Sequence, residues 1–224
     1  MTNPRATPKT IGLSGDLHEY MLAHSTPLLP VQRELIVATA GLGAVAGMQI
    51  APEQGAFMTM LTRLLGVRTA VEVGTFTGYS SLSIALGLGE GGRLLCCDVS
   101  EEWTSIAREH WQRAGVADRI DLRIAPALET LRALPNNAHI DLAFIDADKP
   151  NYPNYFDEIV PRLSPNGVLL VDNVLWGGRV IDADSNDENT TAIRVFNRKV
   201  ADDPRVESVM LPISDGLTMV CRTS

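Results

Sequence analysis

Five short apolar runs alternate with longer helical patterns through the middle of the chain, and this alternation is the strongest constraint on its fold. The runs are Thr69–Val73, Arg93–Cys97, Ile120–Ile124, Asp141–Ile145 and Gly167–Val171. Several are nearly continuous in Val, Ile and Leu, which is typical of strands buried on both faces. The segments between them have helical length: Tyr79–Leu88, Glu101–Ala114, Leu128–Leu134 and Asn154–Leu163. This order predicts an α/β protein with a doubly wound, Rossmann-like parallel sheet and right-handed crossovers.

Both ends of the chain add elements to this sheet. Val206–Ile213 and Leu217–Arg222 are strand-like runs separated by Ser214-Asp215-Gly216, and Asp-Gly between such runs predicts an antiparallel hairpin. Ahead of the first strand, three helices are expected over Leu17–Ala23, Val31–Gly41 and Gly55–Leu65.

Two polar stretches are expected to lie outside regular structure. Residues 1–12 are mostly polar and contain two prolines, so we expect a flexible arm there. The segment between Trp176 and Thr190 is rich in Gly, Asp and Asn and is expected to be a mobile loop. The length of 224 residues suits a single domain.

Charge and composition exclude several classes of partner. The net charge is −8 and no basic block is present, which argues against a nucleic-acid partner. No apolar run approaches the roughly 20 residues that a membrane span requires, so no membrane partner is expected. The three cysteines form no CxxC pair, and no leader-like segment is visible, so a reduced, cytoplasmic protein is expected.

A glycine-containing turn follows the first predicted strand. Gly74 and Gly78 allow the backbone to turn tightly and to approach a ligand closely. The helix that begins near Ser80 then offers free backbone N–H groups. The segment lacks the Gly-Lys-Ser/Thr ending of a phosphate-binding P-loop, and Phe76 replaces the second glycine of the dinucleotide fingerprint.

An acidic residue, Asp98, follows the second predicted strand. A carboxylate at this position can accept hydrogen bonds from ribose hydroxyls. Together with the glycine turn, Asp98 favours a cofactor that contains adenosine.

Three oxygen-bearing side chains follow the fourth and fifth predicted strands. Asp146, Asp172 and Asn173 converge at one edge of the sheet if these strands are neighbours. Carboxylate and amide oxygens suit Mg²⁺, or alternatively Mn²⁺ or Ca²⁺, better than zinc. Three protein ligands leave coordination positions for a substrate with two oxygens.

These motifs, taken in order, resemble the caffeoyl-CoA and catechol O-methyltransferase family, and most of all its small bacterial members. The resemblance covers roughly residues 30–222 and is carried by VEVGTFTGYSSL, LLCCDVSEEW, APALETL, DLAFIDADKPNYPNYFDEIVPRLSPNGVLLVDNVLWGGRV and DPRVESVMLPISDGLTMV. It implies a seven-stranded sheet, S-adenosylmethionine as methyl donor, a divalent cation, a small catechol-like phenolic acceptor and a homodimer.

The resemblance also implies a role for each matching residue. Asp146, Asp172 and Asn173 match the metal ligands, and Lys149 matches the residue proposed as the catalytic base, with Asp146 beside it. Residues that match the cofactor site are Met48, Ile50, Glu72, Gly74, Thr75, Ser80, Asp98, Ala127 and Asp148. Trp176 and Tyr152 are expected either to wall the site or to pack in the core.

The sequence departs from the plant members at the acceptor end. Gly177 and Gly178 follow Trp176 where the plant enzymes have Asn, and no Lys or Arg cluster is available for the CoA phosphates. These differences argue against caffeoyl-CoA itself as the acceptor. Two alternatives remain open: a nicotinamide-dependent oxidoreductase, which leaves the acidic set without a role, and a non-catalytic S-adenosylmethionine-binding protein.

Overall fold

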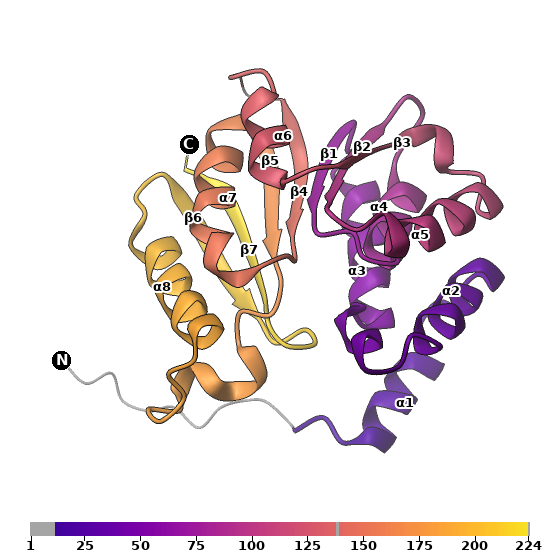
Figure 1. Cartoon of the computed structure of the whole chain (residues 1–224), viewed down its shortest axis with the longest axis horizontal. Coiled ribbons are helices and arrows are strands. Elements are labelled where there is room, and N and C mark those ends of the chain that lie inside the picture. Colours follow the sequence, from indigo (N-terminus) through magenta and orange to yellow (C-terminus); the bar gives the residue numbers. More distant parts are fainter. Residues whose placement is uncertain (1–11, 138, 224) are drawn as a thin grey trace.

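A single seven-stranded sheet organises the computed structural model, which describes residues 12–137 and 139–223 (Figure 1). Its strand order is β3-β2-β1-β4-β5-β7-β6. The strands β1 to β5 are parallel, and β7 pairs antiparallel with both β5 and β6. The strands span Thr69–Val73 (β1), Arg93–Asp98 (β2), Ile120–Ile124 (β3), Ile140–Ile145 (β4), Leu163–Val171 (β5), Val206–Leu211 (β6) and Leu217–Arg222 (β7). The predicted doubly wound sheet with a C-terminal hairpin is confirmed.

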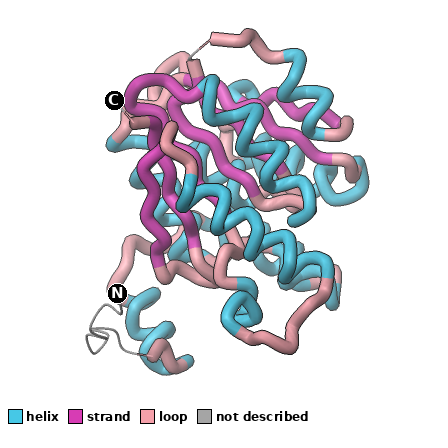
Figure 2. Tube along the Cα trace, turned by 90° about the vertical axis from the view of Figure 1, so that its left-hand side faces the viewer, coloured by secondary structure: helices cyan, strands magenta, loops and turns pink. Residues whose placement is uncertain are grey.

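Helices cover both faces of this sheet, as the turned view shows (Figure 2). The α-helices span Gly15–Ala23 (α1), Pro30–Ala40 (α2), Pro52–Leu64 (α3), Tyr79–Gly87 (α4), Glu101–Arg113 (α5), Ala127–Ala133 (α6), Tyr152–Ile159 (α7) and Glu188–Asp202 (α8). Short 3-10 helices span Gly43–Met48 (η1), Ala117–Arg119 (η2), Lys149–Asn151 (η3), Val160–Arg162 (η4) and Trp176–Ile181 (η5). None of the described helices combines the length and apolar character needed to cross a membrane.

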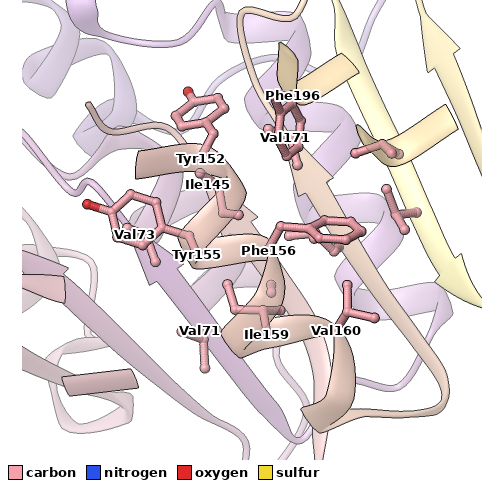
Figure 3. Packing of buried hydrophobic residues seen from close by; sticks show 14 of the residues in the cluster. Val71, Val73, Ile145, Tyr152, Tyr155, Phe156, Ile159, Val160, Val171 and Phe196 are labelled. Carbon is pink, nitrogen blue, oxygen red and sulfur yellow. The ribbon is translucent and has the colours of Figure 1, made fainter. Parts of the chain in front are cut away.

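Alternating strand residues supply two separate cores. On β4, Ala143 and Ile145 face the core under α6, α7 and α8, whereas Leu142 and Phe144 face the core under α2 to α5. The first core centres on α7, where aromatic side chains meet strand valines and Phe196 of α8 (Figure 3). Full burial of one such large apolar side chain stabilises the fold by about 1.5–3 kcal/mol.

The helix α8 was not predicted. The prediction of a loop between Trp176 and Thr190 is wrong at both ends of this segment. Residues of this loop form η5 and the first turn of α8. The sequence did carry a signal for α8, because Asp is favoured at helix N-caps and the buried residues of the helix recur on one face. In the structure Asp187 is the N-cap and accepts a hydrogen bond from Thr190 N (3.0 Å). The expected arm lies almost wholly in residues 1–11, outside the described residues.

The guanidinium of Arg194 ties this connection to α8. It donates to the carbonyl oxygens of Val180 (3.0 Å), Ser185 (2.8 Å) and Arg179 (2.8 Å). The segment therefore has the polar composition of a loop, but one side chain of the following helix holds its backbone in place. The composition of the segment alone does not indicate this contact.

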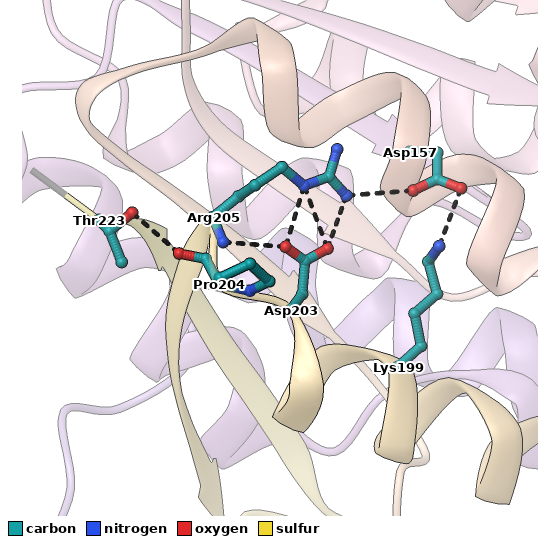
Figure 4. Close-up of polar contacts among 6 residues, drawn as sticks. All are labelled: Asp157, Lys199, Asp203, Pro204, Arg205 and Thr223. Carbon is teal, nitrogen blue, oxygen red and sulfur yellow. Dashed lines mark hydrogen bonds and ion pairs between the residues drawn. The ribbon is translucent and has the colours of Figure 1, made fainter.

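An ion-pair network joins the end of α8 to α7 (Figure 4). Arg205 donates to both oxygens of Asp203, and it also reaches Asp157 Oδ1 (3.3 Å). Lys199 donates to Asp157 Oδ2 (2.9 Å). The guanidinium of Arg205 lowers the pKa of Asp203 to about 2. The network fixes the position of β6 relative to the two helices at the solvent-exposed surface.

Gly74 lets the ends of β1 and β4 touch. A Cβ atom at this position would lie 1.9 Å from the carbonyl oxygen of Asp146, and the residue has a φ of +90°. Asp146 N also donates to Val73 O (2.9 Å), so the two strands stay paired up to their carboxyl ends. No residue other than glycine fits here without moving one strand.

One carboxylate, Glu72, is fully buried in the face of the sheet that packs on α3 and α4. Burial raises its pKa from 4.5 to about 7, against the opposing effect of the Ser80 and Thr75 hydroxyls. Glu72 was expected to line the cofactor site; its side chain is fully buried next to the hydroxyls of Ser80 and Thr75. Strand alternation turns it to the face opposite Val71 and Val73.

We expect the substitution Gly74→Ala to destabilise the protein by about 3 kcal/mol or more, because it combines overpacking with a left-handed backbone. Chemical denaturation measures this change. Gly15→Ala is the matched control, because a Cβ atom at position 15 meets nothing within 4 Å. Equal stability of the Gly74→Ala variant and the wild type would contradict the close approach.

We expect Glu72→Gln to stabilise the protein at alkaline pH. The folded state binds the Glu72 proton more tightly than the unfolded chain, so the stability falls as the pH rises from 4.5 and the full penalty applies above about 7. The penalty is on the order of 3 kcal/mol. The melting temperature of the variant should therefore exceed that of the wild type at pH 8.5 and match it closely near pH 5. A difference that is independent of pH would contradict this assignment.

Candidate active site

A cavity of about 960 Å³ lies beyond the carboxyl ends of the central strands. All the predicted site residues except Glu72 line it: Met48, Ile50, Gly74, Thr75, Ser80, Asp98, Ala127, Asp146, Asp148, Lys149, Asp172 and Asn173. Because β1, β4 and β5 are adjacent and parallel, the side chains that follow them meet at this edge.

The glycine turn and Asp98 form one side of the cavity. Gly78 adopts a left-handed conformation (φ +85°) and directly precedes α4, which exposes the first N–H groups of this helix. The Asp98 carboxylate accepts hydrogen bonds from Thr75 N (2.8 Å), Phe76 N (2.8 Å) and Ser100 N (2.8 Å). Asp98 therefore orders the turn, and it keeps part of its acceptor capacity for a ligand.

An aromatic pair extends this side of the cavity. Trp103 and Phe76 both line it and pack edge to face, with ring centroids 5.1 Å apart. Trp103 projects from the first turn of α5, and Ala127 begins α6 nearby. These groups form an apolar, partly aromatic wall on this side of the cavity.

The predicted metal ligands form the other side, and Lys149 lies among them. Lys149 Nζ donates to Asp146 Oδ1 (2.9 Å), Asn173 Oδ1 (2.7 Å) and Tyr152 Oη (2.7 Å). Asn173 has a positive φ of +58°, which Asn tolerates better than most residues and which turns the chain directly after β5. Asp172 Oδ1 accepts a hydrogen bond from Asn173 N (2.7 Å).

The negative charges of Asp146 and Asp172 repel each other on this side of the cavity. Burial and the charge of Asp146 raise the pKa of Asp172 to about 7. The Lys149 ammonium lies within hydrogen-bonding distance of Asp146 and Asn173. This group of oxygen atoms therefore already attracts one positive charge. Over residues 12–137 and 139–223, no three His, Cys, Asp or Glu side chains lie together as a metal site.

Two residues that the sequence analysis did not single out hold Asp148. Tyr155 Oη donates to Asp148 Oδ1 (2.6 Å), and Asn151 Nδ2 contacts Asp148 Oδ2 (2.5 Å). Tyr155 is one turn beyond Tyr152 on α7, so the repeated tyrosine in the motif NYPNY was the available signal. Tyr152 does not line the cavity, but its hydroxyl orients Lys149.

Residues from the C-terminal part of the chain also line the cavity. They are Trp176 of η5, Asn189 of α8, and Ser214 and Asp215 of the turn between β6 and β7. The hairpin turn between β6 and β7 holds the Trp176 loop, because Leu175 N donates to Asp215 O (3.0 Å) and Gly177 N to Asp215 Oδ1 (2.6 Å). The cavity is thus lined both by residues at strand ends and by residues of η5, α8 and the hairpin turn.

Comparison with known proteins identifies the family of the chain. Residues 23–223 match the family described as O-methyltransferase. A probable caffeoyl-CoA O-methyltransferase 1 from Dictyostelium discoideum is 37% identical over 225 residues, which cover 99% of this chain and 98% of the relative. Tricin synthase 2 from Oryza sativa subsp. japonica is 39% identical over 230 residues, which cover 96% of this chain and 77% of the relative.

Solved structures agree with these relatives. The O-methyltransferase from Bacillus cereus, in complex with SAH, superposes with a TM-score of 0.84 at 32% identity, covering 93% of this chain and 97% of that one. The chain therefore belongs to the O-methyltransferase family and is an O-methyltransferase of the caffeoyl-CoA O-methyltransferase type.

Proposed function

We propose that the protein transfers a methyl group from S-adenosylmethionine to one hydroxyl of a small vicinal diphenol held by a divalent cation. The observation that carries the proposal is the convergence of Asp146, Asp172 and Asn173 in the same cavity as the glycine turn and Asp98. One cavity thus offers a nucleoside site and a hard-oxygen donor set side by side.

The use of S-adenosylmethionine is supported by the family and by the cavity itself. The solved Bacillus cereus relative holds SAH. Here the N-terminus of α4 suits a carboxylate, Asp98 suits ribose hydroxyls, and the wall of Phe76 and Trp103 suits a purine ring. Met48 and Ile50 line the cavity from the segment before α3 and would cover the methionine part.

The donor set fits a divalent cation. Asp146, Asp172 and Asn173 supply only oxygen donors, which Mg²⁺ and Mn²⁺ prefer, and the mutual repulsion of the two carboxylates is relieved by added positive charge. When bound, such a cation lowers the pKa of a hydroxyl that it contacts and fixes its orientation.

The side chains around the donor set supply the remaining functions. Lys149 Nζ lies at the cavity edge within 2.7 Å of Tyr152 Oη, and in its neutral form it can accept a proton from the acceptor hydroxyl. The Lys149 ammonium lies 5.5 Å from the ring centroid of Trp176, and this ring would help to exclude water from a bound acceptor. The rate enhancement would come mainly from alignment of the hydroxyl with the methyl group.

The acceptor end favours a small, uncharged molecule over a CoA thioester. Among the described residues that line the cavity, Lys149 is the only Lys or Arg, whereas Asp215 lies at the mouth. Gly177 and Gly178 carry no side chain that would contact a long acyl group. Relatives named for caffeoyl-CoA and for tricin show that acceptors differ between members of the family.

We expect methyl transfer to a vicinal diphenol to be abolished by EDTA and restored by Mg²⁺. Asp172→Ala should lower kcat/KM by about 100-fold or more, because it removes a donor from the cation site. Radiolabelled S-adenosylmethionine with a panel of catechols and caffeoyl esters measures both effects. Asp118→Asn, an exposed acid outside the cavity, serves as the control. Transfer that is indifferent to EDTA would overturn the cation but not the methyl transfer.

We expect SAH to raise the melting temperature of the protein and NAD to leave it unchanged. Asp98→Ala should weaken SAH binding by about 10-fold or more, since the variant loses both a ligand acceptor and the anchor of the glycine turn. Calorimetric titration checks this, with the exposed Asp121→Asn as the matched variant. Stabilisation by NAD instead of SAH would favour an oxidoreductase. SAH binding without transfer to any acceptor of the panel would favour a non-catalytic binding protein.

A further inference from the structure

The glycine turn is joined to α2 by a buried pair of hydroxyl groups that the proposed mechanism does not use. Thr39, near the end of α2, donates a hydrogen bond from its Oγ1 atom to Oγ1 of Thr77, and the two atoms lie 2.8 Å apart. The two side chains are 1% and 0% exposed, although 38 positions separate them in the chain. Thr77 also lines the cavity. The pair therefore connects a helix that precedes the sheet with the wall of the candidate active site.

The direction in which Thr39 donates its hydrogen bond differs from that of other buried threonines on helices. Thr62 of α3 and Thr104 of α5 each donate to the backbone carbonyl oxygen four residues earlier in the chain, to Met58 O (2.7 Å) and to Ser100 O (2.6 Å). Such a local bond to the backbone is available to any threonine on a helix. Thr39 instead bonds across to the glycine turn. Its hydroxyl group thus serves a contact between two distant segments.

Thr77 lies between two other anchors of the glycine turn. Before it, the carboxylate of Asp98 accepts hydrogen bonds from the backbone N–H groups of Thr75 and Phe76. After it, Gly78 packs against α5, since a Cβ atom at this position would lie 2.5 Å from an alanine Cβ atom of that helix. Three elements, β2, α5 and α2, therefore each fix one part of the turn. The shape that the turn presents to a ligand depends on all three.

The position of α2 is itself fixed by contacts on two sides. Leu35 lies one helical turn before Thr39 on the same face and is fully buried in the core under α2 to α5. At the surface, Arg113 of α5 forms an ion pair with Glu34. From Thr39 the chain continues through η1 to residues 47–50, which all line the cavity. The hydroxyl pair thus links the glycine turn to the start of a second segment that contacts the same cavity.

We infer that Thr39 is a positioning residue for the cosubstrate: through Thr77 it holds the glycine turn in the conformation that binds S-adenosylmethionine. The inference rests on the proposed function. A turn that is already held in its binding conformation gives tighter binding, because apparent affinity scales with the fraction of the protein that is competent to bind. Loss of the bond would leave the buried hydroxyl group of Thr77 without its partner, which favours other conformations of the turn.

Calorimetric titration of the full-length protein with SAH tests the inference. Thr39→Val keeps the shape of the side chain and removes its hydroxyl group. We expect this variant to bind SAH about 3–10-fold more weakly, which is the range for one buried hydrogen bond. Thr39→Ser keeps the hydroxyl group and should bind SAH nearly as tightly as the wild type. Thr62→Val is the matched control and should leave SAH affinity unchanged, since Thr62 is equally buried but bonds within α3.

A double-mutant cycle shows whether Thr39 acts through the glycine turn. Thr77→Val alone should weaken SAH binding. Adding Thr39→Val to it should cause no further loss, because the same hydrogen bond is already absent. The melting temperatures of the ligand-free variants are measured in parallel. A merely structural role would lower the melting temperature and leave the SAH affinity of the folded protein unchanged.

The outcomes separate this inference from the proposed function. If the wild type and Thr39→Val bind SAH equally tightly, the role of Thr39 is overturned and the proposed cosubstrate stands. If the wild type does not bind SAH, both are overturned. Equal losses in Thr39→Ser and Thr39→Val, or a loss that persists when Thr77→Val is present, would assign the effect to packing and overturn the role. A loss that Thr39→Ser restores and that Thr77→Val abolishes supports it.

Discussion

The contact between the carboxyl ends of β1 and β4 is the constraint on which the cavity depends. A Cβ atom at Gly74 would overlap the carbonyl oxygen of Asp146, so these two chain segments lie as close as two backbones can. This contact brings the glycine turn and the acidic edge into one space. Asp98 completes the arrangement from β2, because its carboxylate binds the backbone of the turn. The nucleoside side and the oxygen-donor side of the cavity are therefore parts of one rigid sheet edge.

The two sides differ in how their charge is handled. On the nucleoside side, backbone N–H groups occupy the Asp98 carboxylate. On the other side, Asp146 and Asp172 face each other with the ammonium of Lys149 beside Asp146, and burial leaves Asp172 with a raised pKa. The first arrangement is a hydrogen-bond network, and the second is an electrostatic imbalance, which supports the proposal of a bound cation.

Much of this arrangement could be predicted from the sequence. The five parallel strands, their order of connection and the C-terminal hairpin follow from apolar runs and turn residues, which are local signals. The residues after β1, β2, β4 and β5 could be expected to meet, because the carboxyl ends of parallel strands share an edge. Eleven of the twelve residues expected in the cofactor and cation sites, together with Lys149, line the cavity; Glu72 alone is fully buried and does not line it.

The sequence by itself determined the fold class, the strand-end positions and the kind of oxygen donors, because each depends on local periodicity or on residue type. Only the tertiary structure decided which of these side chains touch. It placed Lys149 between Asp146 and Asn173, and it joined Gly177 to Asp215, which lies 38 residues further along the chain. Such contacts join segments that are distant in sequence, and their geometry is set by the packing of helices on the sheet, which no local pattern encodes.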